Sequence, residues 1–324
     1  MNLEDNKKQM LDLAEKLGVR ASEFSDTLDL LQLNQIHIVD MLPEMLLMIR
    51  SVNAQETFRY KRKPVDNVRR GLLFSFQNIF SHSLDDHVYQ YSEKSLQARP
   101  HIRITPLHLE SEVVFPKGIT INQITILIQL DFLKNFIGKD QEIFSYLFNE
   151  EKTLLIEEFM SPEVADLVNE IAGTPAVGTL SEAYYKLKAL ELLYMLFKNL
   201  SKRQQIKQQS LRSDDIEALY RVRDAISISL DNTLTSDELV KISGMNVLKL
   251  RKLFKQIFGK GIYEYCQYLR MQEAARLMQE KHLSVSETGY QLGFTNLSYF
   301  GRLFEQHFGM KPKKWSAQCK LQAK

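Results

Sequence analysis

Two stretches of the chain, Asn246–Gly259 (NVLKLRKLFKQIFG) and Asn296–Gly309 (NLSYFGRLFEQHFG), match each other at a shift of 50 residues. Apolar residues occupy the same places in both copies: Leu250, Leu253, Phe254 and Phe258, and their counterparts Phe300, Leu303, Phe304 and Phe308. This spacing predicts one buried helical face that the chain uses twice.

A short helix and a tight turn are expected before each copy, over Asp237–Met245 and over Ser286–Thr295, where the turn is one residue longer. Gly244 and Gly293 permit the backbone of the two turns. The asparagine that opens each copy is a good N-cap for the helix that follows. We therefore predict two helix-turn-helix units whose exposed helix starts suit a phosphate group.

Residues 210–318 closely resemble the AraC/XylS transcriptional regulators, whose DNA-binding domain holds two helix-turn-helix units joined by a long helix. The resemblance is carried by LxxLFKxxFG from Leu250, RMQEAARLM over Arg270–Met278, and GFxxxSYFxRLFxxxFGxxP over Gly293–Pro312. It implies a regulator that binds double-stranded promoter DNA and, if it is an activator, contacts RNA polymerase. Thr288 and Gly289 depart from the family's usual Ile-Ala, and Gly301 stands where a small polar residue is usual.

If one face of each recognition helix is core, the opposite face holds the residues that read DNA. The predicted DNA-binding residues are Asn246, Leu248, Lys249, Arg251, Lys252 and Lys255 in the first copy, and Asn296, Ser298, Tyr299 and Arg302 in the second. Arg251 and Arg302 are candidates for bidentate contact with guanine. Lys252 and Lys255 suit phosphate, which sets register. The alternative for each residue is an exposed side chain without a DNA contact.

The distribution of charge divides the chain. Residues 1–200 carry 21 Lys and Arg against 28 Asp and Glu, a net −7, whereas the total for the whole chain is +2. The basic remainder suits a phosphate-bearing partner. A Lys-, Arg- and Gln-rich segment over 202–212 reads as a solvated linker or a frayed helix end. We predict a sensing or dimerisation domain over 1–205 and a DNA-binding domain over 206–324.

The first domain is predicted to be α+β, a cupin-like or β-sandwich sheet followed by helices, ahead of an all-α second domain. Strand candidates are Glu56–Lys61, Gly71–Phe80, Val88–Tyr91, Ile102–Leu109, Val113–Phe115 and Ile119–Leu130. The last of these changes its alternation near Asn122-Gln123, which predicts a bulge or a second strand there. A helix start is expected at Ser161-Pro162.

The apolar helix expected over 181–200 has two interpretations: it packs on its own sheet, or its second apolar face meets another subunit in a homodimer. A segment near the N-terminus, Leu11–Val19, has the rhythm of a helix-turn-helix entry, but we expect a surface helix there instead. Residues 117–138 and the helical tail behind them faintly resemble siderophore-responsive members of the family. A siderophore or another small metabolite is therefore the expected effector, with sugars or a protein partner as alternatives.

A metal-dependent enzyme is the rival function for the first domain. A cupin-like oxygenase needs clustered ligands such as His-x-His followed by Glu, whereas His82, His87, His101 and His108 are scattered. We expect no enzyme activity, metal or cofactor. Cys266 and Cys319 show no ligand spacing and are expected to be reduced. The sequence shows no signal peptide and no apolar run near the roughly 20 residues that cross a bilayer, so we expect a cytoplasmic protein.

Overall fold

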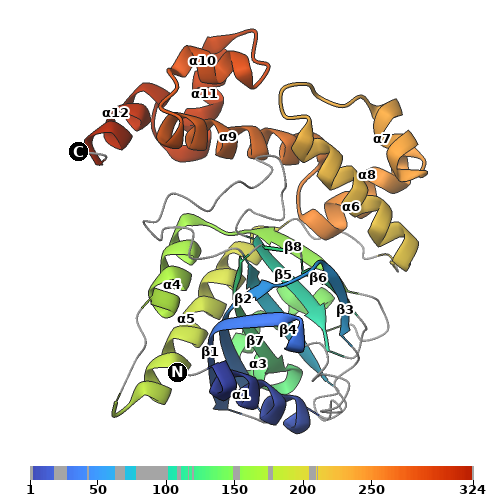
Figure 1. Cartoon of the computed structure of the whole chain (residues 1–324). Coiled ribbons are helices and arrows are strands. Elements are labelled where there is room, and N and C mark those ends of the chain that lie inside the picture. Colours follow the sequence, from blue (N-terminus) through green and yellow to red (C-terminus); the bar gives the residue numbers. More distant parts are fainter. Residues whose placement is uncertain are drawn as a thin grey trace. The chain divides into compact units, whose positions relative to one another are not determined.

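A computed structural model describes residues 3–17, 28–41, 44–62, 70–77, 101–107, 111–115, 117–118, 120–148, 154–173, 178–203, 209 and 211–322. The chain divides into two compact units, with the boundary between residues 210 and 211. The first unit is built around an antiparallel sheet and the second contains helices throughout its described part (Figure 1). The predicted α+β class is confirmed.

The main sheet of the first unit has six strands in the order β1-β2-β7-β4-β5-β8, and β3 pairs with β6 in a separate two-stranded sheet. The strands are β1 (Leu31–Met41), β2 (Met45–Ala54), β3 (Phe58–Arg62), β4 (Gly71–Gln77), β5 (His101–Pro106), β6 (Ser111–Phe115), β7 (Thr120–Gln129) and β8 (Ile156–Phe159). The predictions that correspond to β3, β4, β5, β6 and β7 are confirmed. The candidate Val88–Tyr91 lies outside the described residues, and β1, β2 and β8 were not predicted.

The prediction of a bulge or a second strand near Asn122-Gln123 is wrong. Strand β7 pairs without interruption with β2 from Thr120 to Ile128, and with β4 from Gln123 to Gln129. The alternation changes because this central strand is covered on both faces. Ile124 belongs to the cluster under the C-terminal helices of the unit, whereas Leu127 belongs to the cluster on the opposite face. The register shift that the structure does contain lies in β1, between Leu33 and Gln35.

Helices cover both faces of the main sheet. Helix α1 (Leu3–Lys16) buries Met10 and Leu13 in the cluster that contains Leu46 and Val52, so the expected surface helix is confirmed. The other helices of the unit that the structure describes are α3 (Leu130–Ile137), the 3₁₀ helix η3 (Gly138–Leu147), α4 (Pro162–Gly173) and α5 (Ser181–Leu200). The start of α4 is also confirmed, since the amide of Val164 donates to Ser161 Oγ at 3.4 Å.

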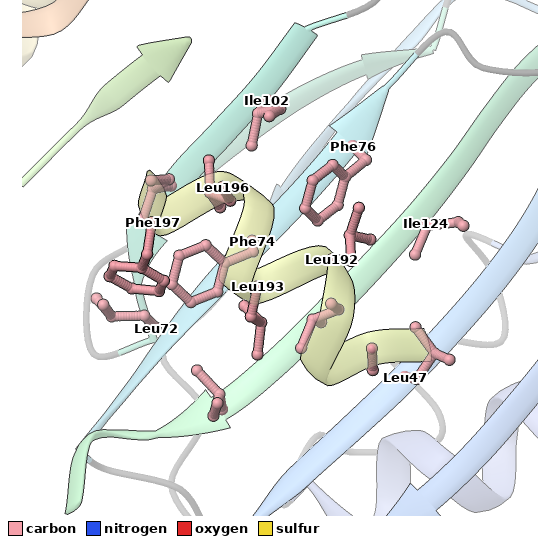
Figure 2. Close-up of a cluster of buried hydrophobic side chains, with 14 of the residues drawn as sticks. Leu47, Leu72, Phe74, Phe76, Ile102, Ile124, Leu192, Leu193, Leu196 and Phe197 are labelled. Atoms are coloured by element: carbon pink, nitrogen blue, oxygen red, sulfur yellow. The ribbon is translucent and has the colours of Figure 1, made fainter. Parts of the chain in front are cut away.

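Helix α5 supplies the largest part of the cover on the other face. Leu192, Leu193 and Leu196 are fully buried there, and Figure 2 shows them facing the side chains of the strands. The ring of Phe197 lies 6.1 Å from that of Phe74 on β4 and 4.9 Å from that of Phe144 in η3. The interpretation that this helix packs on its own sheet is confirmed.

We expect Leu193→Ala to lower the free energy of unfolding of the first unit by about 2–5 kcal/mol, because the side chain is fully buried and its loss leaves a cavity. Lys186→Ala is the matched control on the same helix: the side chain of Lys186 is exposed, so the change should stay within about 0.5 kcal/mol. Urea unfolding followed by circular dichroism measures both variants. Equal losses in the two would contradict this packing.

Candidate nucleic-acid interface

The second unit consists of two groups of helices on one long helix. Its elements are α6 (Ser213–Ile228), α7 (Ser236–Ser243), α8 (Val247–Phe258), α9 (Ile262–Glu280), α10 (Val285–Gln291), α11 (Leu297–Phe308) and α12 (Pro312–Gln322). Helices α6, α7 and α8 lie at one end of α9, and α10, α11 and α12 at its other end (Figure 1). The pairs α7–α8 and α10–α11 are the two predicted helix-turn-helix units. Helix α6 begins at Ser213.

In the first helix-turn-helix unit, side-chain caps fix the starts of both helices, α7 and α8. Thr235 and Glu238 form a capping box: Glu238 Oε2 accepts from the Thr235 amide at 2.7 Å, and Thr235 Oγ1 accepts from the Glu238 amide at 3.3 Å. The bonds that Glu238 Oε2 accepts from the Thr235 amide and from the Thr235 hydroxyl lower the pKa of Glu238. Gly244 then turns the chain with a φ of 67°. The Lys249 amide donates to Asn246 Oδ1 at 2.9 Å, which confirms the predicted N-cap of α8.

The second helix-turn-helix unit repeats this construction. Ser284 and Glu287 form its capping box, and Gly293 turns the chain with a φ of 76°. The Tyr299 amide donates to Asn296 Oδ1 at 2.9 Å, so the predicted cap of α11 is also confirmed. The boxes and glycines are related by a shift of 49 residues and the asparagines by 50, because the second turn contains one more residue.

The repeated apolar face is buried as predicted. Phe254 and Phe258 of α8 are at most 1% exposed, and their rings lie 5.2 Å and 5.4 Å from that of Tyr265 on α9. Phe300 and Phe304 of α11 are fully buried. The other two apolar positions of the second copy, Leu303 and Phe308, are half-buried, and Phe308 is covered by Trp315 of α12, at 4.8 Å between ring centroids.

The opposite face of α8 presents side chains to solvent. Leu248 is 81% exposed, and Arg251 and Lys252 are exposed one turn further on. Lys249 has an internal partner: its Nζ donates at 2.7 Å to Oδ1 of Asp215, in the first turn of α6. Lys255 is half-buried. The predicted residues of this copy therefore share a helix but differ in how much of their charge is available to a ligand.

On α11, Ser298 and Arg302 are exposed and Tyr299 is 38% exposed. The hydroxyl of Tyr299 lies 3.2 Å from that of Tyr263 at the start of α9. This hydrogen bond raises the pKa of Tyr263. Tyr263 is 59% exposed and was not among the predicted site residues, because its place beside α11 depends on a partner 36 positions along the chain.

The far end of α11 is anchored on α9 by a neutral histidine. His307 Nε2 lies 2.9 Å from Gln272 Nε2, and its ring lies 4.8 Å from that of Tyr268. Burial, together with the charge of Lys260, lowers the pKa of His307 to about 4. His307 is consequently uncharged at neutral pH and adds no positive charge to the interface.

No group of three or more His, Cys, Asp or Glu side chains in the described part of the chain is arranged to hold a metal ion; His82, His87 and His108 lie outside it. Among the same residues, no helix combines the length and apolar character needed to cross a membrane.

Comparisons with known proteins concern mainly the second unit. A family model described as "Helix-turn-helix domain" matches residues 239–318. The uncharacterized HTH-type transcriptional regulator YpdC of Escherichia coli K12 is 33% identical over 85 residues, 26% of this chain and 30% of YpdC. The probable transcription factor PqrA of Proteus vulgaris is 33% identical over 92 residues, 26% of this chain and 75% of PqrA. The match thus spans less than a third of YpdC but three quarters of PqrA.

Solved structures give two kinds of match. A Chromobacterium violaceum regulator with an AraC-type DNA-binding domain is 24% identical, with a TM-score of 0.31, and the match covers 33% of this chain and 96% of that one. ToxT from Vibrio cholerae is 13% identical, with a TM-score of 0.31, and the match covers 84% of this chain and 98% of that one.

Of the two unusual residues of α10, Gly289 is explained by packing against α11. A Cβ on Gly289 would lie 2.6 Å from Leu297 Cδ2 and 3.3 Å from Phe300 Cδ1, so glycine permits the close approach of the two helices. Thr288 is fully buried, and its hydroxyl has no hydrogen-bond partner among the described residues. By contrast, a Cβ on Gly301 of α11 meets nothing within 4 Å.

We expect Thr288→Val to raise the free energy of unfolding of the second unit by about 1 kcal/mol, because it replaces an unsatisfied buried hydroxyl with a methyl group of similar shape. Thr235→Val is the control and should lower it by about 1 kcal/mol, since it removes the N-cap of α7. Trp315, the single tryptophan of the chain, lies in this unit, so its fluorescence during urea unfolding measures both. Destabilisation by Thr288→Val would mean that the hydroxyl is satisfied.

Proposed function

The chain belongs to the AraC/XylS family of transcriptional regulators, and on that premise we propose that it is a sequence-specific DNA-binding regulator whose N-terminal unit senses a signal. The observation that carries the proposal is the pair of capped recognition helices, α8 and α11, whose buried faces rest on the second unit's core while Arg251 and Lys252 of α8 and Arg302 of α11 stay exposed. Double-stranded promoter DNA is the partner that suits two such helices, because each can enter one segment of the major groove.

The two recognition helices would bind DNA by different balances of charge and shape. Arg251 and Lys252 are exposed on α8 and Lys255 is half-buried, whereas α11 offers Arg302 beside neutral Ser298 and Tyr299. We assign the guanidinium groups of Arg251 and Arg302 to base edges, and Lys252 and Lys255 to phosphates. Helix α8 then contributes more of the salt-dependent affinity and α11 more of the fit.

The internal ion pair of Lys249 modifies this assignment. Because Asp215 holds its ammonium group, Lys249 would have to exchange a carboxylate for a phosphate in order to bind DNA. Asn246 and Asn296 already use their side-chain oxygens to cap helices. Their contribution to DNA binding is therefore to order the exposed amide groups at the two helix starts, which can face a phosphate. Leu248, the most exposed apolar side chain of α8, suits contact with a thymine methyl group.

The first unit would supply ligand sensing and dimerisation. A siderophore or another small metabolite is the effector we propose, and RNA polymerase is a further partner if the protein activates transcription. For dimerisation, α5 offers a specific surface. Leu187 and Tyr194 lie seven residues apart on one face of α5 and are 69% and 61% exposed, and Leu180, which caps the start of the helix, is 75% exposed. Large apolar side chains exposed along one helix face suit burial against a partner, so we assign this face to a second copy of the chain.

Base reading by Arg251 can be separated from phosphate binding by Lys252. We expect Arg251→Ala to weaken binding to a selected DNA site by about 1–3 kcal/mol while changing binding to random DNA much less, because a base contact is lost. Lys252→Ala should weaken both and reduce the slope of log K against log salt by about 1. The measurement is fluorescence-anisotropy titration of the full chain, at several salt concentrations, with a site selected from random duplexes.

The outcome that contradicts the assignment of Arg251 is an equal loss on selected and random DNA at fixed salt. Failure of the unsubstituted protein to select any sequence would contradict the proposed function itself.

The proposed dimer surface is tested by Leu187→Glu, which places a charge on this face and should shift the protein from dimer to monomer in sedimentation velocity. Lys186→Glu is the control, since residue 186 is exposed on the same helix but lies about 100° around it. A wild-type protein that stays monomeric at all concentrations, or a dimer that survives Leu187→Glu, would exclude this surface.

A further inference from the structure

The turn of the second helix-turn-helix unit contacts the loop that connects α6 to α7, just before the first helix-turn-helix unit. A Cβ built on Gly293 would lie 1.9 Å from the carbonyl oxygen of Asp231 and 2.9 Å from its carbonyl carbon. Real Cβ atoms do not approach backbone atoms this closely. Glycine at this position therefore does more than permit a left-handed turn: it leaves the space that the backbone of the other unit occupies.

A buried side chain of α9 joins the same two places. Arg270 is 6% exposed, and its Nε donates at 2.6 Å to the carbonyl oxygen of Leu230, the residue before Asp231. Its guanidinium carbon lies 5.4 Å from the centroid of the Phe294 ring, the residue after Gly293. One cation thus binds a backbone carbonyl in the loop that leads into the first helix-turn-helix unit and an aromatic face in the turn of the second.

These contacts are strong for a physical reason. A buried guanidinium group needs polar partners, because moving an unpaired charge out of water is costly. Here the carbonyl oxygen of Leu230 and the ring of Phe294 supply two of its contacts, and both cation–carbonyl and cation–π interactions strengthen where water is excluded. Displacing either helix-turn-helix unit from α9 would therefore break a contact of Arg270 as well as the backbone contact at Gly293.

We propose that Arg270, Gly293 and the backbone of Leu230–Asp231 form a rigid junction that fixes the separation and rotation of α8 and α11, and so sets the spacing between the two DNA segments that the protein reads. The proposal rests on the proposed DNA-binding function for its consequence, but its geometry is a property of the protein alone. Spacing matters because about 10–10.5 base pairs make one helical turn, so a single inserted pair rotates one segment relative to the other.

The chain contains a matched control for Gly293. Gly244 holds the equivalent place in the first helix-turn-helix unit, with a φ of 67° against 76° at Gly293. A Cβ on Gly244 meets nothing within 4 Å. Gly244→Ala and Gly293→Ala therefore impose the same kind of backbone strain. Only Gly293→Ala also pushes the second helix-turn-helix unit away from the loop before the first.

The first experiment measures the junction without DNA. Spin labels are attached to Lys252→Cys on α8 and Arg302→Cys on α11 in the full chain, with Cys266→Ala and Cys319→Ser as background changes, and their separation is measured by double electron–electron resonance. We expect one narrow distance distribution in this background and with Gly244→Ala added. Gly293→Ala and, independently, Arg270→Met should broaden or shift it, and Arg270→Lys should restore part of the narrow distribution. The same narrow distribution in all variants would overturn the proposal.

The second experiment measures the consequence for DNA. A site selected from random duplexes by the unsubstituted protein is compared with the same site carrying one inserted base pair between its two halves. We expect the insertion to weaken binding by the unsubstituted protein and by Gly244→Ala roughly tenfold or more, the cost of a misplaced base contact. For Gly293→Ala and Arg270→Met, the ratio of the Kd for the site with the insertion to the Kd for the original site should fall toward unity.

The two experiments separate the possible failures. An unchanged ratio in both junction variants would overturn the role in spacing, even where their overall affinity is lower. If the unsubstituted protein selects no DNA site, the proposed function fails, whereas the spin-label distances still decide whether the junction is rigid. Circular dichroism establishes that each variant is folded, and Arg270→Met carries the test if Gly293→Ala does not fold.

Discussion

The second unit depends on the burial of the same aromatic face in α8 and in α11. Phe254 and Phe258 pack on Tyr265 of α9, while Phe300 and Phe304 are fully buried in the other half. Because a helix that buries one face must expose the opposite one, this packing determines which residues point outward. Arg251, Lys252, Ser298 and Arg302 are exposed as a consequence of where the phenylalanines are. The interface is therefore a product of the core.

Local signals made most of the second unit predictable. N-caps, turn glycines and the apolar spacing lie within a few residues of the structure they determine, and the structure confirms each of them. The first unit was predicted less completely because its strands are defined by distant partners. Strand β2 pairs with residues 120–128 of β7, and the unpredicted β1 adds to the edge of that pair. Strand β7 was read as irregular because its two faces enter different clusters, which alternation along one strand does not reveal.

The same distinction applies to the candidate interface. Sequence periodicity identified the outward residues of α8 and α11, but not the partners that alter their chemistry. Lys249 pairs with Asp215, 34 positions away, and Tyr299 lies against Tyr263, 36 positions away. In both cases the side chain was correctly placed on the exposed face, while the group that takes up its charge or its hydroxyl lies on a different helix. Helical periodicity shows on which face of a helix a side chain lies, and only the tertiary structure shows which group it binds.

Gly244 and Gly293 show most clearly how two residues with the same local role differ in their tertiary contacts. In the sequence they are equivalent, since each stands in the turn of a helix-turn-helix unit, and in the structure they share a left-handed backbone. Local chemistry alone would treat them as one constraint used twice. Yet one faces open space and the other faces the Asp231 carbonyl, 62 positions away. A duplicated motif can therefore keep its local geometry in both copies while a single copy acquires the contact that joins them, and the burial of Arg270 between Leu230 and Phe294 places that contact on the helix common to both.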